Sequence, residues 1–457
     1  MTTEFTAAKR KNVSASRWRR LLIWAAPALV LAACSGTGPQ TSLDPAGPIA
    51  EKIDGLWLLV FWIAVVVFVL VEAALVYSIV KFRERPDSDR RPKQLHGNTR
   101  LEIIWTIIPA LLLAGLTVPT LQTLFEIREV PEGPDVITIQ VVGHQWWWEF
   151  QYPEGFTTAN ELHIPADTTV NLEMTSVDVI HSFWVPKLNG KRDVVPGRMT
   201  NLTLEAYEPT PPGEPHPGQC AEFCGLAHAD MRFKVFVDSA ADYEAWIAQQ
   251  MTPATVPTEG IAAQGYDTFA AVCVACHNAT VVGEDGNPEV LGPVGYVNGV
   301  YADLAPDLTH FGERSTFGSG TFDTPWADGA TEDHLRQWLD NPASIKPMSP
   351  ERNVIPPIGC VPEQERVDLA LEAAIERTVE GEGKILSEET LQTVETLYED
   401  ALAFEALGDQ EACVRALEEA RQLLGYIPDR TLILGMPDFG LDQNEITALI
   451  ALLEGWE

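Results

Sequence analysis

The stretch Cys220-Ala221-Glu222-Phe223-Cys224-Gly225-Leu226-Ala227-His228-Ala229-Asp230-Met231 holds two thiols, an imidazole and a thioether within twelve residues. These four side chains follow one another at spacings of four, four and three residues, and Gly225 allows the backbone to turn between them. Thiolate and thioether ligands beside an imidazole favour copper over calcium, magnesium or manganese. The nearest upstream partner is His181, in residues 178–186, so we expect a second loop to close a copper site.

Two other interpretations of this cluster are a disulfide between Cys220 and Cys224 and a structural zinc site. A disulfide leaves His228 and Met231 without a role. Zinc sites rarely recruit a thioether. A copper site therefore gives a role to more residues of this stretch than a disulfide or a zinc site does.

Length and charge limit the class of protein. A chain of 457 residues is long enough for two or three domains. Its formal net charge of −34 argues against direct nucleic-acid binding, because phosphate contacts need clustered Lys and Arg. An acidic outer face suits basic protein partners, or a salty or acid habitat, and charge alone does not choose between them.

The N-terminus has the pattern of an export signal over residues 1–33. Arg17, Arg19 and Arg20 precede an apolar run at 21–31, and small residues lead to Cys34. The four residues Leu31-Ala32-Ala33-Cys34 resemble a bacterial lipobox, which predicts a lipidated Cys34 followed by a tether over 34–52. The other interpretation is an uncleaved helix in which Cys34 is an ordinary buried cysteine.

Two apolar segments, at about 56–80 and 103–124, have membrane-spanning length and predict a transmembrane hairpin over 53–126. Glu72 interrupts the first segment, and its role stays open. The loop at 81–100 carries seven basic residues against three acidic ones. The positive-inside rule places this loop in the cytoplasm and both outer ends of the hairpin on the exported side.

Short apolar runs separated by Pro and Gly predict an antiparallel β-sandwich or barrel over 130–250. The runs lie at 136–142, 146–152, 161–164, 169–174, 199–205 and 233–237. We expect the metal ligands in loops of this domain, a short helix at 239–250 and a linker at 251–258. His144 and His163 fall in the β region and are interpreted as structural, and His216 and His310 receive no metal role.

Residues 259–457 form a second predicted domain, with helices at 264–277 and 445–453. Within it, Cys273-Val274-Ala275-Cys276-His277 matches the attachment motif for c-type haem, in which both thiols bind the macrocycle and the histidine binds the iron. An insertion at about 354–427, dense in Ala, Leu and Glu, predicts several amphipathic helices. The remaining Cys360 and Cys413 either form a disulfide or stay separate.

At this point the chain resembles subunit II of the haem-copper cytochrome c oxidases over about residues 50–240. The resemblance rests on the transmembrane hairpin, Gly143-His144-Gln145-Trp146-Trp147-Trp148, residues 178–186, Pro196-Gly197-Arg198 and residues 220–231. It implies a multidomain membrane protein: a two-helix hairpin, a cupredoxin β-sandwich that holds the dinuclear copper centre CuA, and an all-α cytochrome c domain with a helical insertion.

The resemblance implies a ligand set for CuA. Cys220 and Cys224 would bridge the two coppers as thiolates, and His181 and His228 would each donate a ring nitrogen. Met231 and the backbone carbonyl of Glu222 would complete the weak outer positions. Many family members have Ser where this chain has Ala221, a position that is not a ligand.

Three further roles are implied by the resemblance. The carboxylate of Glu222 would face a magnesium site shared with subunit I, Trp146 would be the residue where electrons arrive, and Glu102 would mark the mouth of a proton pathway. Each has a structural alternative. Glu102 suits the start of a helix, Trp146 suits a strand or membrane interface, and Glu222 can matter through its carbonyl alone.

The last domain resembles class I cytochrome c domains fused to oxidase subunit II, through residues 305–312 and 338–342. In such domains a Met-Pro pair before the final helix supplies the second axial haem ligand. Here Met436-Pro437 has that position, and Met348 is the alternative. A thioether opposite the histidine raises the haem potential.

Together the resemblances imply subunit II of a terminal oxidase in the bacterial inner membrane, with its cupredoxin and cytochrome domains on the periplasmic side. Haem c would accept electrons from cytochrome c or a cytochrome bc-type complex, and CuA would pass them to subunit I, where O2 is reduced and protons are pumped. Its partners would be subunit I and the other oxidase subunits. The alternatives are a related nitric oxide reductase, a copper-delivery protein, and a quinol oxidase subunit, against which the intact ligand set argues.

Overall fold

A computed structural model describes residues 38–83, 96–131, 133–283, 285–292, 294–297, 300–324, 330–346, 436 and 439–456. Several expectations fall on residues outside these ranges. They are the signal peptide at 1–33, the lipidation of Cys34, the alternative haem ligand Met348, the pairing of Cys360 with Cys413, and the insertion at 354–427.

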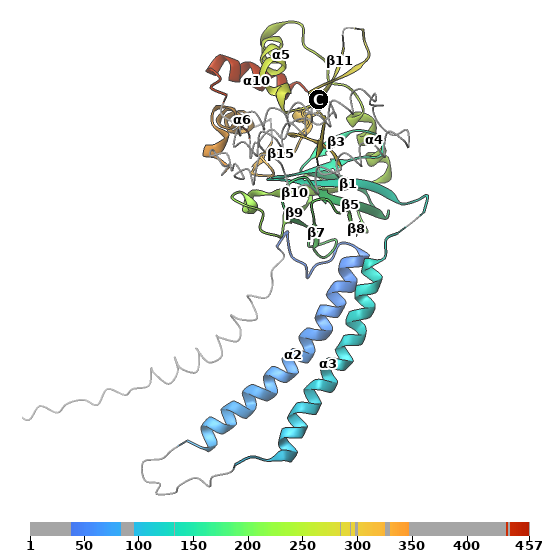
Figure 1. The fold of residues 1–457 in the computed structure, drawn as a ribbon, viewed down its shortest axis with the longest axis vertical. Helices are drawn as coiled ribbons and strands as arrows, with labels where there is room; N and C mark the ends of the chain where they lie inside the picture. Colours follow the sequence, from blue (N-terminus) through green and yellow to red (C-terminus); the bar gives the residue numbers. More distant parts are fainter. Residues whose placement is uncertain are drawn as a thin grey trace, which may run out of the picture.

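Two long helices, α2 (Pro48–Lys81) and α3 (Thr99–Arg128), form the predicted hairpin and extend several residues beyond the predicted limits. Both are long and apolar enough to cross a membrane, and their apolar side chains are exposed along their length. Figure 1 shows the two helices side by side, leaving the globular part of the molecule from one end. At that end Lys52 Nζ lies 3.0 Å from Glu126 Oε2.

Ten strands form two five-stranded sheets packed face to face. The first sheet has the order β3-β2-β1-β5-β8, and the second has the order β4-β10-β9-β6-β7. Their bounds are β1 Ile137–His144, β2 Trp147–Gln151, β3 Thr157–Ala159, β4 Glu161–Pro165, β5 Val170–Ser176, β6 His181–Trp184, β7 Arg192–Val194, β8 Thr200–Leu204, β9 His216–Cys220 and β10 Arg232–Asp238. The predicted sandwich is confirmed.

The expectation of a purely antiparallel sandwich is wrong. Strand β1 runs parallel to β5, with Ile137 opposite Val170, and β10 runs parallel to β4, with Lys234 opposite Glu161. The reason is that β4 leaves the first sheet for the second. The chain therefore returns in β5 along the same direction as β1, instead of turning back in a hairpin.

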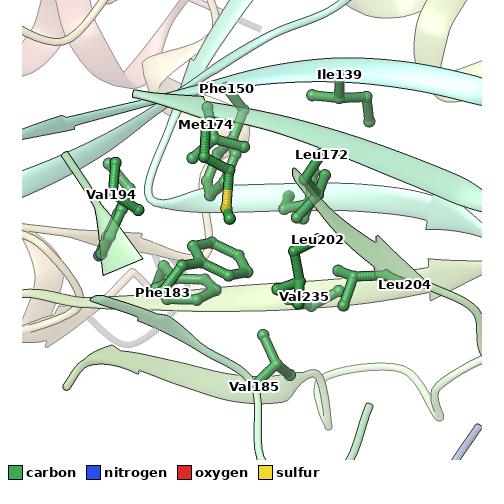
Figure 2. Packing of buried hydrophobic residues seen from close by; sticks show 14 of the residues in the cluster. Ile139, Phe150, Leu172, Met174, Phe183, Val185, Val194, Leu202, Leu204 and Val235 are labelled. Atoms are coloured by element: carbon green, nitrogen blue, oxygen red, sulfur yellow. The ribbon is translucent and has the colours of Figure 1, made fainter. Parts of the chain in front are cut away.

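The core of the sandwich consists of side chains that alternate inward along the strands. Figure 2 shows Phe150, Leu172 and Met174 of the first sheet facing Phe183 and Val235 of the second. The rings of Phe183 and Phe233 stack with centroids 4.4 Å apart. Such aromatic pairs add about 0.5–1.5 kcal/mol each beyond the area they bury.

Helix α4 (Ala240–Gln250) confirms the predicted short helix and leads to the second unit. There α5 (Gly260–Val272), α6 (Ala330–Asp340) and α10 (Gln443–Glu454) occur with three two-stranded hairpins. The hairpins are β11 Ala279–Val282 with β12 Pro288–Leu291, β13 Val294–Val297 with β14 Val300–Asp303, and β15 Thr316–Phe317 with β16 Phe322–Asp323. The described part is therefore not all-α, because its Val- and Thr-rich runs separated by glycines favour hairpins.

In the second unit, helices α5 and α10 are far apart in the sequence but cross in close contact. A Cβ atom added to Gly265 of α5 would lie 2.1 Å from the carbonyl oxygen of Ala448 in α10, so only glycine permits this approach. Phe269 packs edge-on against Trp456, with ring centroids 4.9 Å apart. Asp442 and Glu445 form a capping box that fixes the start of α10.

The second unit sits on the sandwich on the side away from α2 and α3 (Figure 1). Buried Glu161 of β4 accepts hydrogen bonds from the backbone N–H groups of Ser315 (2.9 Å) and Thr316 (2.8 Å). At the rim, Lys234 Nζ lies 2.8 Å from Asp323 Oδ1. The two units thus meet through a buried carboxylate as well as an exposed ion pair.

Candidate functional site

The residues expected to bind copper come together at one end of the second sheet. His181 opens β6 and Cys220 closes β9, so both are held by the strand ladder, in which Phe183 lies opposite Cys220. The expectation that all ligands lie in loops is therefore wrong for these two residues. Cys224, His228 and Met231 follow in the turn before β10, where the Cys220 N–H donates to the Met231 carbonyl at 3.0 Å.

The sulfur atoms of Cys220 and Cys224 are 3.8 Å apart, and each has its own imidazole. His181 Nδ1 lies 3.9 Å from Cys220 Sγ, and His228 Nδ1 lies 3.5 Å from Cys224 Sγ. A disulfide would need a sulfur separation of about 2.05 Å, so the two thiols are not joined in this structure. His181, Cys220 and Cys224 have ligand atoms within 4.8 Å of one another, as a metal site requires.

Each thiol also has one weaker neighbour. Met231 Sδ lies 3.8 Å from Cys224 Sγ, and the carbonyl oxygen of Glu222 lies 3.2 Å from Cys220 Sγ. The donor set is thus symmetric: one sulfur, one ring nitrogen and one weak donor on each side. All six expected donor groups converge here, which the spacing of residues 220–231 alone did not guarantee.

Fully buried His181 is oriented by Asp178, whose Oδ1 lies 2.8 Å from His181 Nε2. This contact leaves Nδ1 directed at the thiols, in the way that carboxylates orient metal-binding histidines. Burial alone would lower the pKa of His181, but hydrogen bonds to Asp178 and Cys220 raise it. The other Asp178 oxygen accepts from the Gln145 N–H at 2.5 Å, which ties the ligand to β1–β2.

The two thiols titrate as a pair. Their mutual hydrogen bond lowers the pKa of Cys220 and raises the pKa of Cys224. The pair therefore holds one proton more readily than none, and a bound metal must displace it because thiolates are the ligands.

Trp146 lies against the backbone of the cluster. Its indole Nε1 donates to the Cys224 carbonyl at 2.9 Å, and the Gln145 side chain donates to the same oxygen at 2.6 Å. Gly225 has φ +113°, and a Cβ there would lie 3.0 Å from the Trp146 ring. Glycine is needed at this position both for its backbone angle and for the indole contact.

The remaining expected residues are placed separately. The Glu222 side chain is exposed and its Oε1 accepts from the Phe223 N–H at 3.2 Å, while its backbone carbonyl meets the sulfur cluster. Glu102 lies in the first turn of α3, where its Oε1 accepts from the Asn98 N–H at 3.2 Å. This contact fits the helix-start alternative.

The other histidines stay out of the metal cluster. His144 Nε2 lies 2.8 Å from Glu149 Oε2, and His163 Nδ1 lies 2.7 Å from Asp238 Oδ2. Both have carboxylate partners, as their structural interpretation implies, and His144 also lines the cavity between the two units. Among the described residues, His216 and His310 likewise belong to no candidate metal cluster.

A second site is a cavity between the two units. Its lining brings Cys273, Cys276 and His277 together with Met436, the residue expected from far along the sequence. His277 Nδ1 donates to the Pro306 carbonyl at 2.7 Å, which leaves Nε2 available to bind a metal. Burial lowers the pKa of His277 to about 4, so the ring is neutral at physiological pH, as an iron ligand must be.

The cavity suits a large, flat, mostly apolar group with an anionic edge. Its apolar lining includes Phe269, Leu308, Phe317, Trp338, Leu449 and Leu453. Two cations also line it, Arg314 and Lys346, and burial lowers the pKa of both, that of Lys346 to about 7. Sequence reasoning gave them no role. The available signal was a pair of basic residues in a strongly acidic chain.

Comparisons with known proteins agree on one family. The description "Cytochrome C oxidase subunit II, transmembrane domain" matches residues 39–123, and "Cytochrome C oxidase subunit II, periplasmic domain" matches residues 155–238. Cytochrome c oxidase subunit 2 of Alkalihalophilus pseudofirmus is 36% identical over 334 residues, covering 72% of this chain and 88% of that protein. The Bacillus subtilis protein of the same name is 33% identical over 342 residues, covering 72% and 90%. Quinol oxidase subunit 2 of Bacillus spizizenii is 34% identical over 236 residues, covering 49% and 70%.

Proposed function

The chain belongs to the cytochrome c oxidase subunit II family, and we propose that it relays electrons through a covalent haem and a dinuclear copper centre toward subunit I. As a family member it is a component of the oxidase complex, alongside subunit I and the other subunits. It is an inner-membrane protein with its globular part on the periplasmic side.

Family membership implies copper, and the donor set at residues 181 and 220–231 fits it. When bound, a copper pair bridged by two thiolates supplies a one-electron acceptor that changes shape little on reduction. Cys220 and Cys224 would bridge, His181 and His228 would bind one copper each, and Met231 and the Glu222 carbonyl would be the weak ligands. Support comes from the paired distances of 3.5–3.9 Å between thiols and imidazoles.

The second cavity fits a c-type haem, which when bound supplies a one-electron carrier of raised potential. Cys273 and Cys276 would attach it and His277 would bind the iron. Met436, which lines the cavity, is the proposed second axial ligand, with Met348 as the alternative. Arg314 would offset the charge of the haem propionates.

The remaining roles follow the family pattern. Trp146 would receive electrons on the copper side, Glu222 would face a magnesium ion shared with subunit I, and Glu102 would mark a proton pathway. Cys34 would carry the lipid anchor. Cytochrome c or a cytochrome bc-type complex would be the donor, and O2 reduction coupled to proton pumping would take place in subunit I.

The observation that carries the copper proposal is the pair of thiols 3.8 Å apart, each with its own imidazole. A quinol oxidase subunit without copper would have no use for this arrangement, although such relatives match half of the chain. A copper-delivery protein would have no use for the Met231 contact or for a haem cavity.

Spectra of the purified oxidase test both groups together. We expect a near-infrared band from mixed-valence copper and visible bands from one covalent haem in this chain. O2 uptake with reduced cytochrome c should be far faster than nitric oxide reduction by the same preparation. A missing near-infrared band would refute the copper centre, and the opposite substrate preference would favour the nitric oxide reductase alternative.

A further inference from the structure

The carbonyl oxygen of buried Trp146 accepts two hydrogen bonds across the joint between the two units. Lys346 Nζ donates to this oxygen at 2.7 Å, and Ser319 Oγ donates to it at 2.7 Å. Lys346 Nζ also donates to Ser319 Oγ at 2.6 Å, so the three groups form a closed triangle. We call this triangle the Trp146 clamp. Both of its donors come from the second unit and its acceptor comes from the sandwich.

The opposite side of Trp146 faces the copper ligands. The indole Nε1 donates to the carbonyl of Cys224, at 2.9 Å. Trp146 also lines the cavity that contains Cys273, Cys276 and His277. Trp146 therefore contacts the proposed copper ligand Cys224 through its ring and lines the proposed haem cavity. Its carbonyl accepts hydrogen bonds from the second unit.

The serine of the clamp is held in a tight turn. Gly318, Ser319 and Gly320 have φ angles of 61°, 59° and 72°, all in the left-handed region. A Cβ on Gly318 would lie 3.2 Å from the Trp338 ring, and one on Gly320 would lie 3.3 Å from Arg232 Cβ. The turn is thus packed between α6 and the start of β10, which orients the Ser319 hydroxyl before any group binds.

Lys346 is unusual in its surroundings. It is 4% exposed, and among the described residues no carboxylate lies within ion-pair distance of its ammonium. Burial of an ammonium whose hydrogen-bond acceptors are neutral is costly. The charge strengthens the hydrogen bonds that Lys346 donates to the Trp146 carbonyl and to Ser319, because charge-assisted hydrogen bonds are stronger than neutral ones.

We propose that Lys346 is a positioning residue for electron transfer between the two redox sites. It holds Trp146 through the carbonyl, so that the indole stays on Cys224 while the second unit stays against the other side of the same residue. This inference rests on the proposed function. A haem held by Cys273, Cys276 and His277 would be oxidised by one electron, and a copper centre held by Cys220 and Cys224 would be reduced by that electron, with no atom or proton transferred.

The test uses the whole oxidase with the Lys346→Met variant, which keeps the length of the side chain but removes its charge and donors. The rate of internal electron transfer from haem to copper is followed after rapid reduction. We expect it to fall by about tenfold or more, because the charge-assisted hydrogen bond that holds Trp146 is lost. Pulsed dipolar electron paramagnetic resonance should show a broader distribution of haem–copper distances. Lys346→Arg should restore part of the rate.

The matched control is Lys234→Met, which removes the exposed Lys234–Asp323 ion pair across the same joint without touching Trp146. Its rate should stay within about twofold of the wild type, since exposed pairs contribute little. Ser319→Ala removes the other donor and serves if Lys346→Met does not fold. We expect an intermediate slowing from it.

Internal transfer at the wild-type rate in Lys346→Met, or in Ser319→Ala if the first variant does not fold, would overturn the proposal. Wild-type oxidase that lacks either the copper band or the haem bands would instead overturn the proposed function, and this is measured first. Slower internal electron transfer in Lys346→Met, with the copper and haem bands intact, would support the positioning role of Lys346 and leave the proposed function in place.

Discussion

The copper cluster and the haem cavity are built in opposite ways. In the cluster, β6, β9 and the turn before β10 supply the ligands, and thiols and imidazoles already lie 3.5–3.9 Å apart. In the cavity, three of the proposed ligands come from five consecutive residues, and the fourth, Met436, comes from a distant part of the chain.

The two sites therefore differ in what fixes the positions of their ligands. Strand pairing and the Asp178 contact fix the copper ligands before metal arrives, as preorganised sites require. The proposed haem ligands would depend on covalent attachment at one end and on the packing of α5 against α10 around them. Changes to a ligand should therefore act locally in the sandwich, and changes to packing should act on the second unit.

The largest effect is expected from Cys220→Ser. The variant removes one of the two bridging sulfurs, so the near-infrared copper band should disappear and O2 uptake should fall to background. The haem bands should be unchanged, because the cavity shares no ligand with the cluster. Copper content and absorption spectra of the purified oxidase check this.

The neighbouring Ala221→Ser is the matched control, because that side chain is not a ligand. It should keep both the band and the activity. A full copper band in Cys220→Ser would contradict the assignment.

The next effect is expected from Met436→Leu. Loss of the thioether should lower the haem potential by on the order of 0.2 V, within the ~0.8 V span that axial ligands cover. Redox titration of the visible bands measures this shift. Met251→Leu, at an exposed methionine that follows α4, should leave the potential unchanged. An unchanged haem potential in Met436→Leu would indicate that Met348 is the second axial ligand instead.

A smaller effect is expected in the pH dependence of stability, from Asp303 at the joint between the two units. Burial and the neighbouring carboxylate of Glu149 raise the pKa of Asp303 to about 8. This folded-state pKa lies above the unfolded value of about 3.9. The stability that protonated Asp303 gives the folded state is therefore fully present below pH ~4 and is lost as the pH rises toward 8. The slope is at most about 1.4 kcal/mol per pH unit.

The thermal midpoint of the second unit should therefore fall between pH 6 and pH 8. In Asp303→Asn, which keeps the shape but not the titration, the fall should be shallower. Identical pH profiles for wild type and variant would show that Asp303 does not titrate in this range.

The smallest effect is expected from Gly265→Ala. In a helix interior Ala is favoured over Gly by about 0.5–1 kcal/mol. Here the added carbon would meet the Ala448 carbonyl, and overpacking costs about 1–3 kcal/mol. The net change should be destabilising and confined to the second unit, as differential scanning calorimetry would show. Ala270→Ser on the exposed side of α5 should change stability by less than about 0.5 kcal/mol. A stabilised Gly265→Ala would refute the tight crossing.

Much of the sandwich could be predicted because six strands alternate apolar residues between turn signals. Strand β9 could not, since His216-Pro217-Gly218-Gln219-Cys220 contains two residues that usually argue against a strand. The structure explains the glycine: a Cβ on Gly218 would lie 2.2 Å from the Phe233 ring. Missing β6 and β9 led to the wrong placement of His181 and Cys220 in loops.

The clustering of the proposed copper ligands could be predicted because most of them lie close together in sequence and have a distinctive chemistry. Arg314 and Lys346 could not, because their function depends on burial, which a single basic residue in a sequence does not reveal. The clamp on Trp146 is likewise a tertiary contact between residues 200 positions apart. Sequence spacing carries no information about such a contact.

The order of reduction tests the central claim most directly. Oxidase blocked at subunit I is mixed with its reduced donor, and the visible haem bands and the near-infrared copper band are followed together. The account predicts that the haem is reduced first and the copper band bleaches afterwards. In a chain with both Cys273→Ser and Cys276→Ser, which has no thiol left to attach the haem, the copper should stay oxidised after the same donor is added. Reduction of its copper at the wild-type rate would contradict the account.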